Sequence, residues 1–225
     1  MARIYTVQSS AAEIAERFAA DAPPGLSVPR ECTEGEPGLV VFERGGVRHL
    51  RSMTWGFPRL TREMDLRGEM PDRVGMVSDL TNPMWDKLVV EPRYRCLIPI
   101  TSFANPDGVE GKKIRTWFSV KDTPLMAWAG FCRTTNEFGP VFAGMTMEAN
   151  AAVMPYNERM PVLLGREEWE RWLHGTIQDV IGFQFRAPIA ADRMEITPTK
   201  HGWRSGVVPD MRAGELIQAS APLRL

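Results

Sequence analysis

Three polar residues stand directly before an apolar run in the segment P-Y-N-E-R-M-P-V-L-L, Pro155 to Leu164. Asn157-Glu158-Arg159 lies in this segment between two prolines, which restrict the backbone on either side. An asparagine amide can hydrogen-bond, and a guanidinium can bind phosphate or another anion through its planar donor fork. Two interpretations stay open: a polar loop whose Arg159 pairs with a carboxylate, or the frame of a site that faces a groove.

The residues that most often supply nucleophiles and metal ligands are dispersed along the chain. They are His49, His174 and His201, and Cys32, Cys96 and Cys132. An odd number of cysteines without C-x-x-C spacing argues against a disulfide framework and a zinc knuckle. Phosphate-binding, dinucleotide-binding, serine-hydrolase and H-E-x-x-H motifs are absent from the sequence. We therefore expect no metal site and no cofactor.

The composition is that of a globular protein without a dominant charge. The chain has 225 residues, of which 44% are apolar and 24% charged, and its formal net charge is -1. No global positive field would attract nucleic acid, so a nucleic-acid site would have to be a local groove. Basic residues are clustered at Arg44, Arg48 and Arg51, at Arg93 and Arg95, and at Lys112, Lys113 and Arg115. Most clusters of this kind form a solvated surface.

The apolar runs are short. L-M-A-W-A-G-F-C, from Leu125 to Cys132, is far below the roughly 20 residues that a membrane helix needs. The first residues do not have the pattern of a signal peptide. Together with the cysteine usage, this predicts a cytoplasmic protein without a membrane partner.

Strand-like segments dominate the rest of the chain. Ser10-x-x-Glu13 predicts a capping box and a helix over about residues 10–20, and Arg44-Gly45-Gly46 predicts a hairpin turn. A short amphipathic helix is expected from Arg166 to Gly175. Further strands are expected at R-C-L-I-P-I, T-W-F-S-V, L-M-A-W-A-G-F-C, P-V-F-A-G-M and M-E-I-T-P. The pattern predicts one α+β domain in which helices pack outside the strands.

Several segments also occur in an order that is typical of one protein family. They are M-A-R-I-Y-T with the helix after it, M-T-W-G-F-P-R at 53–59, R-C-L-I-P-I-T-S-F at 95–103, W-F-S-V before A-W-A-G-F, M-T-M-E-A-N at 145–150, and N-E-R-M-P-V-L-L. This ordered set, over roughly residues 1–173, resembles the SRAP family, the SOS response-associated peptidases. The resemblance implies a single SRAP-like domain over residues 1–225, with a strand-rich, barrel-like core and peripheral helices.

The resemblance further implies a chemistry, the covalent capture of abasic sites in single-stranded DNA. In the family, removal of the initiator methionine exposes a cysteine. Its amine and thiol close a thiazolidine ring on the sugar aldehyde, while a glutamate, a histidine and an asparagine assist. An α-amine that titrates near about 7.7–8.0 is partly neutral, and hence nucleophilic, at physiological pH.

This sequence departs from the family at the reactive positions. Ala2 takes the place of the cysteine, Asn105 that of the glutamate and Asn157 that of the histidine. The family's asparagine is expected around Met76 to Ser78, where the sequence reads M-V-S. Alanine lacks a thiol, and amides cannot act as a general acid or base near neutral pH. No catalytic residue is therefore assigned, and thiazolidine crosslinking is expected to be lost.

Other positions of the family frame are retained, and from them we predict DNA-binding residues. They are Trp55, Arg95, Thr146 and Arg159. For Trp55 a place in the core and a role as a base-stacking platform both stay open.

Three functions remain open at this stage, and we favour the first. It is non-covalent binding of single-stranded DNA, with affinity that falls steeply with salt. The second is residual imine or lyase chemistry at abasic sites through the amine of Ala2. The third is a protein-interaction module, which surface exposure of Trp85, Trp169 or Trp203 would favour.

Overall fold

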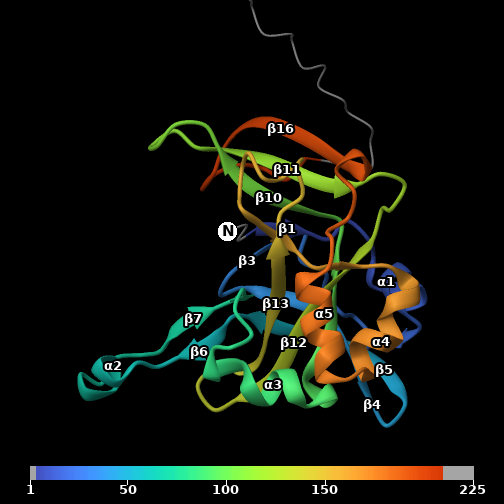
Figure 1. Ribbon diagram of the computed structural model, residues 1–225, viewed down its shortest axis with the longest axis vertical. Coiled ribbons are helices and arrows are strands. Elements are labelled where there is room, and N and C mark those ends of the chain that lie inside the picture. Colours follow the sequence, from blue (N-terminus) through green and yellow to red (C-terminus); the bar gives the residue numbers. More distant parts are fainter. Residues whose placement is uncertain (1–3, 210–225) are drawn as a thin grey trace, which may run out of the picture.

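A closed ring of strands forms the centre of the computed structural model, which describes residues 4–209 (Figure 1). The ring consists of β4 (Pro37–Arg44), β5 (Val47–Trp55), β9 (Arg95–Ile100), β12 (Met126–Thr135) and β13 (Gly139–Glu148). Antiparallel pairs join β5, β4, β9, β12 and β13 in that order, and a parallel β13–β5 pair closes the ring. Closure removes free strand edges. The predicted α+β class and strand-rich, barrel-like core are confirmed.

Short strands extend the ring at its rim. They are β2 (Ala20–Asp21), β8 (Met76–Val77), β14 (Arg159–Pro161) and β15 (Leu163–Leu164). The β4–β5 turn is Gly45-Gly46, and both glycines have positive φ, as a tight two-residue hairpin turn requires. The hairpin predicted from Arg44-Gly45-Gly46 is thus confirmed.

A second sheet lies across one end of the ring (Figure 1). Its strand order is β16 (Met194–Gly202), β11 (Ile114–Val120), β10 (Ser102–Asp107), β1 (Ile4–Thr6) and β3 (Glu31–Thr33). Because side chains alternate across a strand, the two faces differ. Phe103 and Phe118 belong to the main core, whereas Ile4, Ala104 and Trp117 form a small separate cluster.

Helices pack outside the strands, as predicted. They are α1 (Ala11–Phe18), α2 (Arg62–Leu66), α3 (Asp86–Val90), α4 (Trp169–His174) and α5 (Ile177–Phe185). Ser10 and Glu13 form the expected capping box of α1, and Phe18 stacks on Trp169 with ring centroids 4.5 Å apart. Within residues 4–209, no helix has the length and apolarity that a membrane span requires.

Helix α5 was not expected from the sequence, although its start carries a signal. The Thr176 hydroxyl accepts a hydrogen bond from the Asp179 amide, and the Asp179 carboxylate accepts one from the Thr176 amide at 2.7 Å. This is a capping box with aspartate in place of the usual glutamate or glutamine. Gln184, near the far end of the helix, reaches back to the carbonyl of Thr146 at 3.0 Å.

Asp179 gives the folded state a measurable pH dependence. Hydrogen bonds from Arg171 and from Thr176 lower the pKa of Asp179 to about 2. A carboxylate with a lowered pKa stabilises the fold fully above its unfolded pKa, and the contribution is lost as pH falls through the folded value. We expect Asp179→Asn to lower the urea midpoint at pH 7, and the difference from wild type to shrink between about pH 4 and pH 2. Asp192→Asn, at an exposed aspartate, is the control; a difference that grew on acidification would contradict the assignment.

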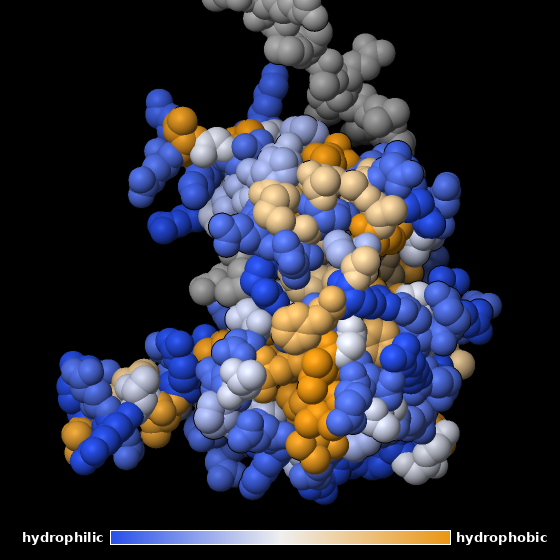
Figure 2. All heavy atoms as spheres, viewed as in Figure 1, coloured by the Kyte–Doolittle hydropathy of each residue, from blue (hydrophilic) through white to orange (hydrophobic). Residues whose placement is uncertain are grey.

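A narrow arm extends from the ring on the same side as the hairpin formed by β10 and β11 (Figure 1). Strands β6 (Phe57–Arg59) and β7 (Asp72–Val74) pair with each other and carry α2 at the tip. Figure 2 shows the surface hollowed between this arm and the end of the β10–β11 hairpin.

Candidate functional site

Asn105 and Asn157, which are distant in the sequence, meet in the folded chain. Asn105 lies on β10 and is wholly buried, and Asn157 lies in the turn before β14. Nδ2 of Asn157 donates to Oδ1 of Asn105 at 3.0 Å. Nδ2 of Asn105 is buried and has no hydrogen-bond partner within residues 4–209. A buried amide group without a partner costs about 1–3 kcal/mol.

Arg159 is held at the edge of the same site. Its Nε donates to Oγ1 of Thr146 at 2.9 Å and its Nη2 to the Thr146 carbonyl at 2.6 Å. Its backbone amide donates to Oδ1 of Asn157 at 3.1 Å. Asn157 therefore links the Asn105 amide to the turn that orients Arg159. The predicted residues Asn105, Thr146, Asn157 and Arg159 come together.

The charge of Arg159 is not neutralised by a direct ion pair in the described part of the chain. Burial lowers the pKa of Arg159, and the carboxylates of Glu148 and Asp79 partly offset this. A guanidinium is strongly basic, so the side chain stays cationic at neutral pH. The geometry therefore does not support the first interpretation of the sequence, in which Arg159 pairs with a carboxylate.

Arg159 lines one of two adjoining cavities, and neither cavity is lined by Asn105 or Asn157. One, of about 420 Å³, is lined by Arg159, Ser78, Glu148 and Phe185 among others. The second, of about 270 Å³, shares Ser78 and includes Arg59, Arg73 and Asp79. Ser78 ends the segment where the resemblance places the family's asparagine, so this segment does lie beside Arg159.

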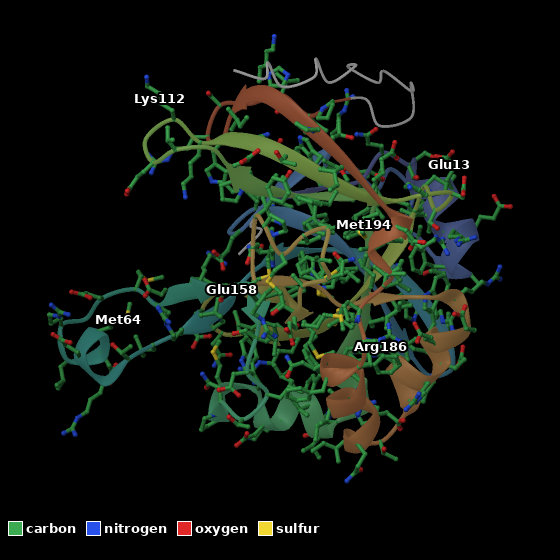
Figure 3. The ribbon with its side chains drawn as sticks, turned by 45° about the horizontal axis from the view of Figure 1, so that its top comes forward. Glu13, Met64, Lys112, Glu158, Arg186 and Met194 are labelled. Carbon is green, nitrogen blue, oxygen red and sulfur yellow. The ribbon has the colours of Figure 1, made fainter. Side chains whose placement is uncertain are left out.

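Figure 3 places Glu158, a neighbour of the cluster in sequence, beside the hollow. Glu158, the residue between Asn157 and Arg159, lies between the hairpin that carries Lys112 and the arm that carries Met64. On the sheet, Ile4 pairs with Ala104, the residue before Asn105. Ala2 lies outside the described residues, and Ile4 is the nearest described position to it.

Arg95 and Trp55 do not lie at this site, which corrects their predicted role. The Arg95 side chain is 1% exposed and donates to the carbonyls of Trp172, Gly175 and Val89. It thereby joins the end of α4 to the ring. Trp55 is also 1% exposed, stacks on Phe142 and donates from Nε1 to the Gly75 carbonyl at 2.8 Å. Neither side chain is accessible to DNA, because both are packed inside the protein.

The tryptophans considered for a partner surface are also mostly interior. Trp85 is 2% exposed and Trp169 is 3% exposed. Trp203, at the end of the second sheet, is partly exposed. An extended aromatic partner surface is thus not formed by these three residues.

The cysteines lack the environment of a nucleophile. Cys32, Cys96 and Cys132 are free and buried. Burial raises the pKa of Cys32 to about 12 and raises the pKa of Cys96 well above its usual value. The thiolate is the reactive form, so neither of these two thiols is activated.

One group of possible metal ligands exists among the described residues, away from the hollow. Oxygen or nitrogen atoms of Glu43, Glu170 and His174 lie within 4.8 Å of one another. Arg48 forms ion pairs with both carboxylates. Arg48 therefore neutralises one of the two negative charges, and the group forms part of an ion-pair cluster.

Comparison with known proteins agrees with this architecture. The sequence matches the family described as SOS response associated peptidase (SRAP) over residues 1–201. The chain belongs to the SRAP family. No curated protein sequence matches it significantly.

Solved structures share the fold. A protein from Bordetella bronchiseptica superposes with a TM-score of 0.72 at 20% identity, covering 88% of this chain and 99% of that one. A protein from Bacteroides thetaiotaomicron gives 0.70 at 17% identity, over 87% and 90%. A phage-related protein from Bordetella bronchiseptica gives 0.66 at 16% identity, over 88% and 94%. At such identities the similarity concerns the fold alone.

Proposed function

We propose that this SRAP protein binds single-stranded DNA non-covalently in the hollow beside Arg159 and does not crosslink abasic sites. The observation that carries the proposal is the hydrogen-bonded amide pair of Asn105 and Asn157. The resemblance assigns a glutamate and a histidine to these positions. Two amides preserve a polar contact there but cannot move a proton near neutral pH. Ala2, at the position of the family's cysteine, removes the thiol as well.

The groups around the hollow suit a strand of nucleic acid. Arg159 and Arg73 supply cations to the two cavities, and the Arg73 guanidinium lies 3.6 Å from the centroid of the Phe138 ring. Phe185, which lines the larger cavity, is 78% exposed. An exposed aromatic ring beside a cation can stack on a base of any sequence while the cation neutralises a phosphate. Phe185 thus replaces Trp55 as the candidate stacking platform.

Binding is expected to depend on salt and on Arg159. In a fluorescence anisotropy titration with a labelled 20-nucleotide single strand, the logarithm of the association constant should fall linearly with the logarithm of salt concentration, with a slope of roughly -0.7 for each phosphate neutralised. Arg159→Gln should weaken binding roughly tenfold, the equivalent of about 1.4 kcal/mol.

Arg17→Gln is the matched control, because Arg17 is exposed on α1, away from the hollow. Thermal unfolding of both variants checks that the fold is intact. Absent or salt-independent binding at micromolar protein would refute the proposal.

A further inference from the structure

A second positively charged cavity lies at the tip of the β10–β11 hairpin, outside the site described above. Its volume is about 700 Å³, and its lining includes Lys112, Lys113, Lys200 and Arg204 against the single carboxylate of Glu110. None of these four cations forms an ion pair within residues 4–209. The local field is therefore positive, although the net charge of the chain is -1.

Trp203 also lines the cavity, and its backbone is held on both sides. Its backbone amide donates to the Lys113 carbonyl at 2.8 Å, and its carbonyl accepts from Nε of Arg115 at 3.0 Å. Arg115 is 3% exposed and is held by Glu31 at 2.6 and 3.2 Å. Arg115 is thus a buried support of Trp203, although the sequence grouped it with the surface lysines.

The Trp203 ring is also seated on the sheet that carries the candidate site. It packs against the small cluster that contains Ile4, Ala104, Trp117 and Val208, and the residue stays partly exposed. A side chain that is packed on the protein and whose backbone is hydrogen-bonded loses less freedom on binding, so Trp203 is preorganised for stacking.

The cavity is near enough to the hollow for one strand to reach both. On β10, Asp107 lies two residues beyond Asn105 and pairs with Ile114, which lines the cavity. At about 3.3 Å per residue this is a separation of roughly 7 Å along the strand. Figure 3 shows Lys112 at the end of the same hairpin that borders the hollow near Glu158.

We propose that this cavity is a second subsite for single-stranded DNA, in which the lysines bind backbone phosphates and Trp203 stacks on a base. The inference rests on the proposed function and extends it to the strand that leaves the hollow. Lysines and arginine recognise the phosphodiester charge, and an indole stacks on any base. The subsite is therefore independent of sequence.

Intrinsic fluorescence gives a direct test at Trp203. The other six tryptophans, Trp55, Trp85, Trp117, Trp128, Trp169 and Trp172, are at most 3% exposed. Acrylamide quenching therefore reports mainly on Trp203. A 20-nucleotide single strand should change this emission and protect it from acrylamide, saturating at the concentrations that saturate anisotropy. Trp203→Phe should abolish the fluorescence response while keeping a ring against the small cluster.

Charge removal tests the lysines. The triple variant K112Q/K113Q/K200Q should bind the 20-nucleotide strand roughly tenfold more weakly, and its salt slope should be smaller by about 2, at roughly 0.7 per lost contact. R17Q/R44Q/K87Q, which removes three exposed cations elsewhere, should leave the affinity and salt slope for the 20-nucleotide strand unaffected.

The outcomes separate the two proposals. If the lysine triple variant leaves the affinity and slope for the long strand unchanged while Arg159→Gln weakens binding, the second subsite is refuted and the hollow stands. If wild type does not bind the 20-nucleotide strand, both proposals fail together. If inorganic phosphate alone alters the Trp203 emission and the long strand does not, the cavity is a small-anion site, and the DNA subsite is refuted.

Discussion

Replacing the three departing residues by the family's own is expected to create covalent capture where the wild type has none. With an oligonucleotide that contains an abasic site, wild-type protein should give no heat-stable conjugate on a denaturing gel. The triple variant A2C/N105E/N157H should give one, because a terminal thiol and amine can close a thiazolidine on the aldehyde. Asn105 and Asn157 touch at 3.0 Å, so a carboxylate and an imidazole at these positions would lie within reach of each other.

The single variant Ala2→Cys tests the nucleophile without the acid and base groups at positions 105 and 157. General acid and base groups contribute about 10²–10⁴-fold, so Ala2→Cys should form the conjugate about 10²-fold or more slowly than the triple variant. Ala2→Ser, which adds a hydroxyl but no thiol, is the control. Mass spectrometry must show that Met1 has been removed in every sample. A heat-stable conjugate formed by the wild type would overturn the assignment of Ala2, Asn105 and Asn157 as replaced reactive positions.

Trapping with borohydride distinguishes non-covalent binding from residual imine chemistry. An imine between the amine of Ala2 and the sugar aldehyde would be reduced to a stable adduct only when borohydride is present. A trapped adduct of the wild type would support the second function that the sequence left open. No adduct, together with salt-dependent anisotropy, would leave binding alone.

The local elements of the fold were predictable because their signals are local. Ser10 and Glu13 predict α1, and Gly45-Gly46 predicts the hairpin. Each signal depends only on residues within four positions of one another. Helix α5 was missed because its capping box uses Asp179 in place of the more familiar Glu or Gln. A search for any carboxylate three residues after a serine or threonine would have found it.

The roles of the arginines could not be predicted in the same way. Arg95 and Arg159 both begin strands, yet the Arg95 side chain donates to carbonyls of α3 and of the end of α4, whereas Arg159 lines a cavity. The carbonyls of Trp172 and Gly175 lie 77 and 80 residues away in the sequence, so the environment of Arg95 exists only after folding. Only the family resemblance marks Asn105 and Asn157 as related positions, since no local rule connects residues on β10 with the turn before β14.

Gly144 is expected to be the most sensitive glycine in the ring. It lies on β13, paired with Gly130 on β12, and a Cβ added there would overlap Cζ2 of Trp128. The Trp128 ring has little room to retreat. It is 1% exposed, donates from Nε1 to the Met145 carbonyl at 2.7 Å, and meets the ring of Trp55 edge-on at 5.8 Å.

Gly144→Ala should therefore lower the free energy of unfolding by about 3 kcal/mol or more, at the upper end for an overpacked core. Gly182→Ala is the matched control: Gly182 lies within α5, and nothing lies within 4 Å of an added Cβ there. That change should raise the free energy of unfolding by roughly 0.5–1 kcal/mol, because alanine favours the helix. Urea unfolding with a constant m-value measures both. Similar effects of the two variants would mean that β13 can shift away from Trp128. Thr146, two residues further along β13, would then shift as well and would not hold Arg159 in one position.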